Sequence, residues 1–178
     1  MSSDSNKPNI AAVIVRDAEP GDIPQVYKLM EELILFLANQ DLRLYTEEEF
    51  FQFVFGKNPM CLCLVAVLKE DPNFVVGYST YFTMFNSVDG LSTTLEELYV
   101  KSNYRGKGIG TILWKKVTQK ALDMGCNSTI FVAHQWNKRA LDMYTRHGCE
   151  NLTEMNGKLL LHFSKKDMED FVKTSEKA

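Results

Sequence analysis

Two neighbouring glutamates, Glu96 and Glu97, lie in the middle of an apolar run, residues 94–100, that is predicted to be a strand. Alternate residues of a strand point to opposite faces, so one carboxylate can face a ligand groove while the other faces a different partner. A carboxylate at such a position can accept a proton in general acid–base chemistry. The alternative interpretation is one solvated glutamate and one charge at a sheet edge.

The segment "NYRGKGIG", residues 103–110, follows this run and precedes a predicted helix over residues 111–124. Its spacing matches neither the Walker A loop nor the dinucleotide-binding fingerprint, and leaves an Arg-x-x-Gly-x-Gly arrangement from Arg105 to Gly110. Glycines let backbone amides approach a phosphate closely, and the helix that follows offers free amides and its positive dipole end. Arg105 and Lys107 add positive charge. The alternative is a plain tight turn between strand and helix.

A third candidate, Tyr144, lies on a predicted helix that Asn137 caps and Gly148 ends. Tyr144 comes two turns after Asn137, with Ala140 on the same side, so a small residue leaves room for a ligand beside the phenol. A phenol beside such a space can donate a proton or a hydrogen bond to a reacting group. From spacing alone, a core role for this tyrosine is the alternative.

The elements around these residues alternate strand and helix in the order βααβββαβαββ, which predicts an α/β fold with a mixed central sheet of about six to seven strands and flanking helices. An antiparallel meander before the glycine loop excludes a doubly wound fold. The predicted strands are residues 10–15, 61–68, 74–85, 95–100, 128–133, 150–153 and 158–163, and the predicted helices are residues 23–38, 46–55, 111–124, 137–148 and 166–173. The last two strands flank "EMNG", which is typical of a hairpin turn.

The length of 178 residues predicts one domain over residues 10–173, and the polar residues at 1–9 and 174–178 predict flexible ends. A net charge of −3 argues against nucleic acid as a partner. The four cysteines form no CxxC pair and histidines are few, so no metal site is expected. The first residues carry no apolar signal region and no run approaches a membrane span, which predicts a cytoplasmic protein without a membrane partner.

The glycine loop resembles the acetyl-CoA pyrophosphate loop of the GNAT acetyltransferase superfamily, and the element order resembles that fold along nearly the whole chain. The segments "TLEELYVKSNYRGKGIG" and "QWNKRALDMYTRHG" are similar to the diamine and polyamine acetyltransferases. The pieces "ALDMGC", "WNKRALDMY" and "NLTE" are most similar to the thialysine-acetylating branch. The resemblance implies an N-acetyltransferase that uses acetyl-CoA as cosubstrate, acts on a small primary amine without a metal, and forms a homodimer.

The resemblance also implies roles for individual residues. Tyr144 is the proton donor beside the cofactor sulfur, Glu96 is the base, directly or through water, and Glu97 helps to bind a cationic substrate. Apart from the resemblance, His134 is an alternative base, because it lies just past a predicted strand end and histidine titrates near neutrality; the resembling families do not rely on a histidine there. The implied cofactor-binding residues are Leu98, Tyr99, Val100, Arg105, Gly106, Lys107, Gly108, Ile109, Gly110, Thr111, Asn137, Lys138, Arg139 and Ala140. The implied substrate-binding residues, beyond the two glutamates, are Phe36, Leu37, Ile130, Phe131 and Val132.

One departure from the polyamine-specific relatives bears on the substrate. Phe36 and Leu37 stand where those relatives carry a tyrosine–glutamate pair, and a lost carboxylate removes an attraction of about 1 kcal/mol. This disfavours spermidine and spermine and favours a lysine-like amine or a short diamine, unless Glu31, Glu32 or Asp41 compensates. Two other functions stay open: acetylation of a protein amino terminus or lysine, and a CoA-binding regulatory domain without catalysis.

Overall fold

The computed structural model describes residues 12–37, 45–157 and 159–175. These residues form two compact units, one up to Val132 and one from Ala133 onward, and each unit is described by itself. The predicted flexible ends fall outside the described residues, apart from residues 174 and 175 at the end of the last helix.

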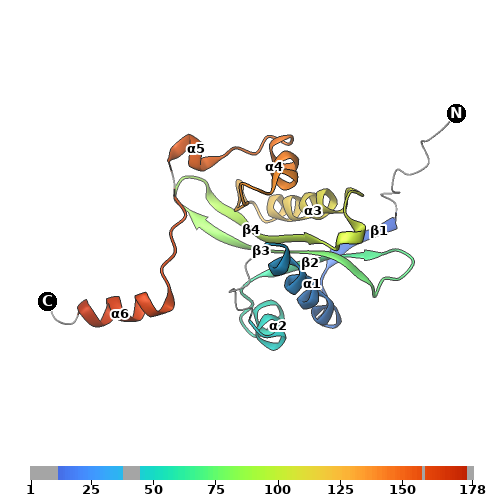
Figure 1. The fold of residues 1–178 in the computed structure, drawn as a ribbon, viewed down its shortest axis with the longest axis horizontal. Coiled ribbons are helices and arrows are strands. Elements are labelled where there is room, and N and C mark those ends of the chain that lie inside the picture. Colours follow the sequence, from blue (N-terminus) through green and yellow to red (C-terminus); the bar gives the residue numbers. More distant parts are fainter. Residues whose placement is uncertain (1–11, 38–44, 158, 176–178) are drawn as a thin grey trace. The chain divides into compact units, whose positions relative to one another are not determined.

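The first unit is a five-stranded sheet in the order β1-β2-β3-β4-β5 with three α-helices (Figure 1). Strands β1 to β4 pair antiparallel, and β5 pairs parallel to β4, so the sheet is mixed as predicted. The strands are β1 (Val13–Asp17), β2 (Leu62–Leu68), β3 (Val75–Asn86), β4 (Gly90–Val100) and β5 (Ser128–Phe131). The helices are α1 (Ile23–Phe36), α2 (Glu47–Phe55) and α3 (Ile109–Asp123), and short 3-10 turns cover Pro20–Asp22 and Ser102–Tyr104.

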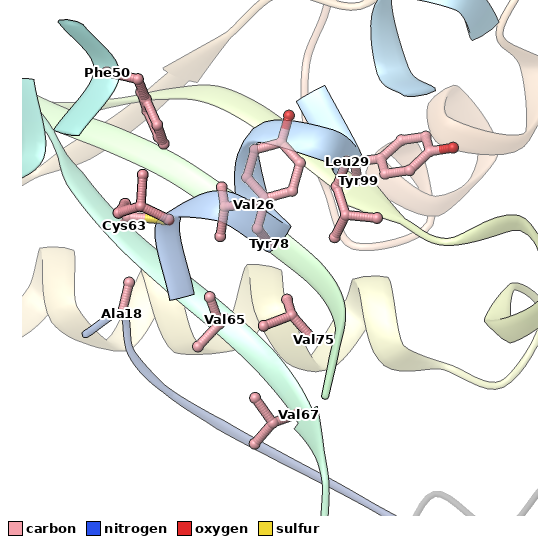
Figure 2. Close-up of a cluster of buried hydrophobic side chains, with 11 residues drawn as sticks. Ala18, Val26, Leu29, Phe50, Cys63, Val65, Val67, Val75, Tyr78 and Tyr99 are labelled. Carbon is pink, nitrogen blue, oxygen red and sulfur yellow. The ribbon is translucent and has the colours of Figure 1, made fainter. Parts of the chain in front are cut away.

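Helices α1 and α2 cover one face of the sheet and α3 covers the other (Figure 1). Strand β2 is a continuous apolar run because both of its faces are covered: Val65 packs under α1, while Leu64 packs under α3. On the α1 face, Val26 and Leu29 lie over β2 and β3, with Tyr78 and Tyr99 in the same cluster (Figure 2).

The capping box predicted at the start of α2 is present. Thr46 Oγ1 accepts the Glu49 amide at 3.2 Å, and Glu49 Oε2 accepts the Thr46 amide at 2.8 Å. Helix α3 begins at Ile109, two residues earlier than its periodicity predicts, because Gly108 adopts a left-handed φ of 76° and ends the turn there.

A one-residue bulge interrupts β4 at Glu96. Thr80 of β3 pairs with Glu97, and the next residue, Tyr81, pairs with Leu95, so Glu96 has no partner across the ladder. The bulge reverses the alternation of side chains. Leu95 packs on the α3 face, whereas Glu97, two residues on, lies on the α1 face beside Tyr78.

The second unit contains α4 (Lys138–Thr145), α5 (Leu152–Asn156) and α6 (Lys165–Ser175). The predicted hairpin of residues 150–153 and 158–163 is wrong, and in the described part of the chain the sheet has five strands in place of six to seven. Asn151 Oδ1 accepts the amides of Thr153 and Glu154, which starts a helix in place of a strand. Gly157 has the positive φ expected of an Asn-Gly pair, but it ends helix α5 and does not form a hairpin turn. Residues 159–164 form no regular element, and Lys158 lies outside the described residues.

Candidate active site

The pairing of β4 with β5 ends at Leu95 and Phe131, whereas β4 itself continues to Val100. Along residues 96–100 only one edge of β4 is paired, to β3, within the described sheet. The Lys101 amide donates to Val76 at 2.9 Å on the β3 side. Because backbone groups alternate along a strand, the N–H and C=O of Leu98 point away from β3, toward the open edge. The predicted contact of a pantetheine arm with this main chain needs such an edge.

The two glutamates differ in their surroundings. Glu96, at the bulge, is exposed to solvent. Glu97 is half-buried, and its Oε2 accepts hydrogen bonds from the Tyr78 hydroxyl at 3.1 Å and the Thr80 hydroxyl at 3.3 Å. Burial is the main cause that raises the pKa of Glu97 above its ordinary value, and the nearby charge of Glu96 adds to it, while the two hydroxyls oppose the shift.

The glycine loop forms the start of α3. Gly106 and Gly108 both have positive φ, 83° and 76°, which a side chain would strain. Ile112 donates the first intrahelical hydrogen bond, to Gly108 at 3.1 Å, so the amides of Ile109 and Gly110 lie ahead of it in the first turn. A methyl group added to Gly110 would meet Leu98 at 3.5 Å, an ordinary contact, so the protein's own packing leaves room there.

The side chain of Arg105 is held against aromatic rings. Its guanidinium carbon lies 4.7 Å from the centre of the Phe36 ring and 4.8 Å from that of Tyr99, and its Nε donates to the Val100 carbonyl at 2.8 Å. This contact joins the end of α1 to the glycine loop. Lys107 Nζ lies 5.3 Å from the centre of the Tyr104 ring.

Of the three acidic residues that could compensate for the missing glutamate, Glu32 is the one directed at β4. Its Oε2 accepts the Tyr99 hydroxyl at 3.1 Å, and the residue is half-buried. Glu31 is exposed on the same helix, and Asp41 lies outside the described residues.

The remaining substrate candidates of the first unit are spread over two elements. Phe36 is 42% exposed at the end of α1, and Leu37, just after it, is half-buried. Ile130 and Phe131 end β5, where Phe131 packs edge-on against Trp114 of α3 with ring centres 6.2 Å apart. Val132, directly after β5, is 71% exposed.

In the second unit, Asn137 caps α4 as predicted, with Oδ1 accepting the Ala140 amide at 3.3 Å. Tyr144 is buried, and burial raises its pKa to about 12, so the phenol stays protonated at neutral pH and can act as a hydrogen donor. Lys138 and Arg139 are exposed, as is His134, whose ring stacks on Trp136 at 5.4 Å between centres.

Sequence reasoning missed Tyr78 and Thr80. Both are nearly fully buried, at 0% and 3% exposure, on the strand next to the glutamates. Two hydroxyl residues spaced two apart in an apolar strand are a signal of a shared polar face. Matching them to Glu97 needs the pairing register, which the bulge shifts.

The acetyltransferase (GNAT) family model matches residues 26–149, which include most of α1, the bulged strand, the glycine loop and α4. The chain belongs to this family. It is 37% identical over 153 residues to the thialysine N-epsilon-acetyltransferase of Bos taurus, covering 83% of this chain and 90% of that protein. It is 31% identical over 160 residues to spermidine/spermine N(1)-acetyltransferase-like protein 1 of Homo sapiens, covering 88% of this chain and 23% of that protein. The chain is therefore an N-acetyltransferase, and the comparisons support the diamine/thialysine branch that the sequence motifs predict.

Solved structures with the same fold include an integron cassette protein from the mobile metagenome of V. cholerae. Its TM-score is 0.71 at 21% identity, covering 91% of this chain and 98% of that one. An aminoglycoside acetyltransferase from a soil metagenome has a TM-score of 0.66 at 18% identity, covering 86% and 95%. These likenesses confirm the predicted GNAT fold.

Among the described residues, no group of three or more histidine, cysteine, aspartate or glutamate residues could hold a metal ion. No helix there is long and apolar enough to cross a membrane.

Proposed function

We propose that this N-acetyltransferase uses acetyl-CoA to acetylate a primary amine of a small basic molecule. The observation that carries the proposal is the open edge of β4, where pairing with β5 stops at Leu95, directly before the bulged Glu96. The glycine loop follows the same strand after a few residues, with the first-turn amides of α3 beyond it. Strand edge, carboxylate and anion-binding helix start are thus consecutive on one chain segment.

Each part has a separate task in this proposal. The thioester of acetyl-CoA supplies the acyl group, and the amine attacks it directly in a ternary complex, since no cysteine lies among the motif residues. The first turn of α3 and Lys107 bind the pyrophosphate, and the main chain around Leu98 holds the pantetheine arm. Exposed Glu96 takes the proton of the ammonium through a water. Tyr144, which is protonated at neutral pH, donates to the departing sulfur.

The substrate class that we propose is a lysine-like amino acid such as thialysine, or a short diamine. The negative charge of three carboxylates in the first unit favours a cationic substrate. They belong to Glu96 and Glu97 on β4 and to Glu32, which accepts a hydrogen bond from the Tyr99 hydroxyl. Phe36 carries no charge and contacts Arg105, so the end of α1 adds no negative charge there for a long polycation. The name of the Bos taurus relative supports the same class.

The protein is further proposed to work as a homodimer in the cytoplasm, without nucleic-acid or membrane partners, in accord with its net charge of −3. Size-exclusion chromatography with light scattering tests the dimer. A monomer at all concentrations that retains full turnover contradicts it.

The function is tested by mixing the purified protein with acetyl-CoA and single amines, and following free thiol. The panel is thialysine, lysine, putrescine, spermidine and a histone peptide. We expect the largest kcat/KM with thialysine or putrescine. A clear preference for the peptide would instead indicate a protein acetyltransferase. If CoA binds but no free thiol forms with any of the amines, the proposed reaction is refuted.

A further inference from the structure

The open edge of β4 has one polar face and one apolar face. On the α1 face, Glu97 accepts hydrogen bonds from the hydroxyls of Tyr78 and Thr80. On the α3 face, Leu98 packs against the buried cluster, and a methyl group added to Gly110 would lie 3.5 Å from it. An amine carries a charge and an alkyl chain carries none, so the polar face suits an amine and the apolar face suits the chain of an acyl group.

Two aromatic rings stand on the apolar face, at the point where β4 and β5 separate. Phe131 is the last residue of β5 and pairs with Leu95, and both side chains pack in the cluster under α3. Trp114 of α3 meets the Phe131 ring edge-on, with ring centres 6.2 Å apart. Gly110 and Trp114 are four residues apart on α3, so they lie on the same side of the helix. This side is therefore narrow beside Leu98 and bulky where the strands separate.

The course of the cofactor follows from the proposed function, on which this inference rests. There the pyrophosphate binds at the first turn of α3, and the pantetheine arm follows β4 from Leu98 toward the bulged Glu96. The thioester then comes to the end of the β4–β5 ladder. Since the amine approaches from the polar face, the carbon atoms beyond the carbonyl turn to the other face, toward Trp114 and Phe131.

We propose that Trp114 and Phe131 together limit the length of the acyl group, so that the enzyme transfers acetyl and excludes butyryl and longer chains. The chemical step is the same for every donor. The carbon–nitrogen bond forms and the carbon–sulfur bond breaks, so a protonated amine and an acyl-CoA give an amide, the free thiol of CoA and a proton. Only the chain that must fit beside the two rings differs, and extra methylenes against packed side chains are unfavourable.

The test measures kcat/KM for acetyl-CoA, propionyl-CoA and butyryl-CoA by free thiol, with the best amine of the panel at saturation. In wild type we expect kcat/KM for butyryl-CoA to be at least about 100-fold below that for acetyl-CoA, with propionyl-CoA between them. Trp114→Leu should narrow this gap by about tenfold or more, and Phe131→Leu should act in the same direction. Trp114→Phe, which keeps an aromatic ring, should narrow it less.

Matched controls separate the limit on chain length from a general loss of packing. Phe74→Leu removes another half-buried ring of the same face, which contacts the ring of Tyr104 with centres 6.3 Å apart. Val117→Ala opens space in the core of α3, nearly one turn beyond Trp114. Both should lower Tm but leave the ratio of butyryl-CoA to acetyl-CoA within about twofold of wild type. Thermal unfolding identifies any variant that fails to fold, and Trp114→Phe serves as the milder change.

Calorimetric titration of acetyl-CoA and butyryl-CoA without an amine measures affinity without turnover. Butyryl-CoA should bind wild type about tenfold or more weakly than acetyl-CoA, and Trp114→Leu should remove the difference. If acetyl-CoA releases no thiol with any amine, the proposed function fails, and the calorimetric series alone decides this inference. Equal use or equal binding of the two donors by wild type overturns it. An unchanged ratio in both Trp114→Leu and Phe131→Leu, or an equal change in the two controls, overturns it as well.

Discussion

Replacing Arg105 with lysine separates two roles that the loop arginine can have. Lysine keeps the positive charge but loses the planar group that contacts Phe36 and Tyr99 and the Nε bond to Val100. Two cation–π contacts are worth about 0.5–1 kcal/mol each, and lysine can replace part of the hydrogen bond, so we expect a loss of about 2 kcal/mol. For a chain of this length each kcal/mol lowers Tm by about 2–4 °C, so Tm falls by about 4–8 °C.

The assay is scanning calorimetry of wild type and Arg105→Lys, together with KM for acetyl-CoA and for the amine. Because the contact ties α1 to the glycine loop, both KM values should rise by several-fold. Arg146→Lys is the control: its Nε also donates to a carbonyl, at 2.8 Å, but on the exposed side of α4. An unchanged Tm with an unchanged amine KM would refute the reasoning and leave Arg105 with a purely electrostatic role.

Three further outcomes are expected. Tyr144→Phe should lose most of its turnover and keep its CoA affinity by calorimetry; near-normal kcat removes the proton-donor role. Since the pKa of Glu97 is raised in the folded state, its contribution to stability falls as pH rises above its ordinary value near 4.5. In urea titrations, the difference in unfolding free energy between wild type and Glu97→Gln should therefore shift against wild type from pH 4.5 to 8; a shift the other way contradicts the burial argument. Ser79→Ala should change stability by less than about 1 kcal/mol, because the buried hydroxyl has no hydrogen-bond partner within the described part of the chain; a loss above about 2 kcal/mol points to a hidden partner.

Most of the fold could be predicted because local patterns and packing agree. Strand β2 is an unbroken apolar run, α1 repeats apolar residues at helical spacing, and Thr46 carries its capping partner at the required distance. The predicted hairpin of residues 150–153 and 158–163 is wrong because its sequence signal is compatible with two structures. An Asn-Gly pair favours positive φ both in a hairpin and at a helix end, and Asn151 upstream decides for the helix.

The sequence predicts which residue types belong to the candidate site, but not the surroundings of each residue. Glu96, Glu97 and the glycine loop stand out in the sequence, but their environments depend on register. The sequence contains no sign that Glu96 has no partner across the ladder, and so no sign that Glu97 meets Tyr78. The contact of Arg105 with Phe36 joins residues that are distant in sequence, so it depends on how α1 lies across the sheet.

The bulge residue Glu96 adds a carboxylate to the candidate site, but the pairing of the strands does not depend on it. The bulge reverses the alternation of side chains along β4. If Glu96 were deleted, Leu95 and Glu97 would become adjacent residues that point to opposite faces, as in any regular strand. Every core side chain of β4 would keep its face, and pairing with β5, which ends at Leu95, would be untouched. In this respect Glu96 is a single-residue insertion in an otherwise complete scaffold. A chain of 177 residues that lacks Glu96 is therefore a suitable folded control for kinetic comparisons.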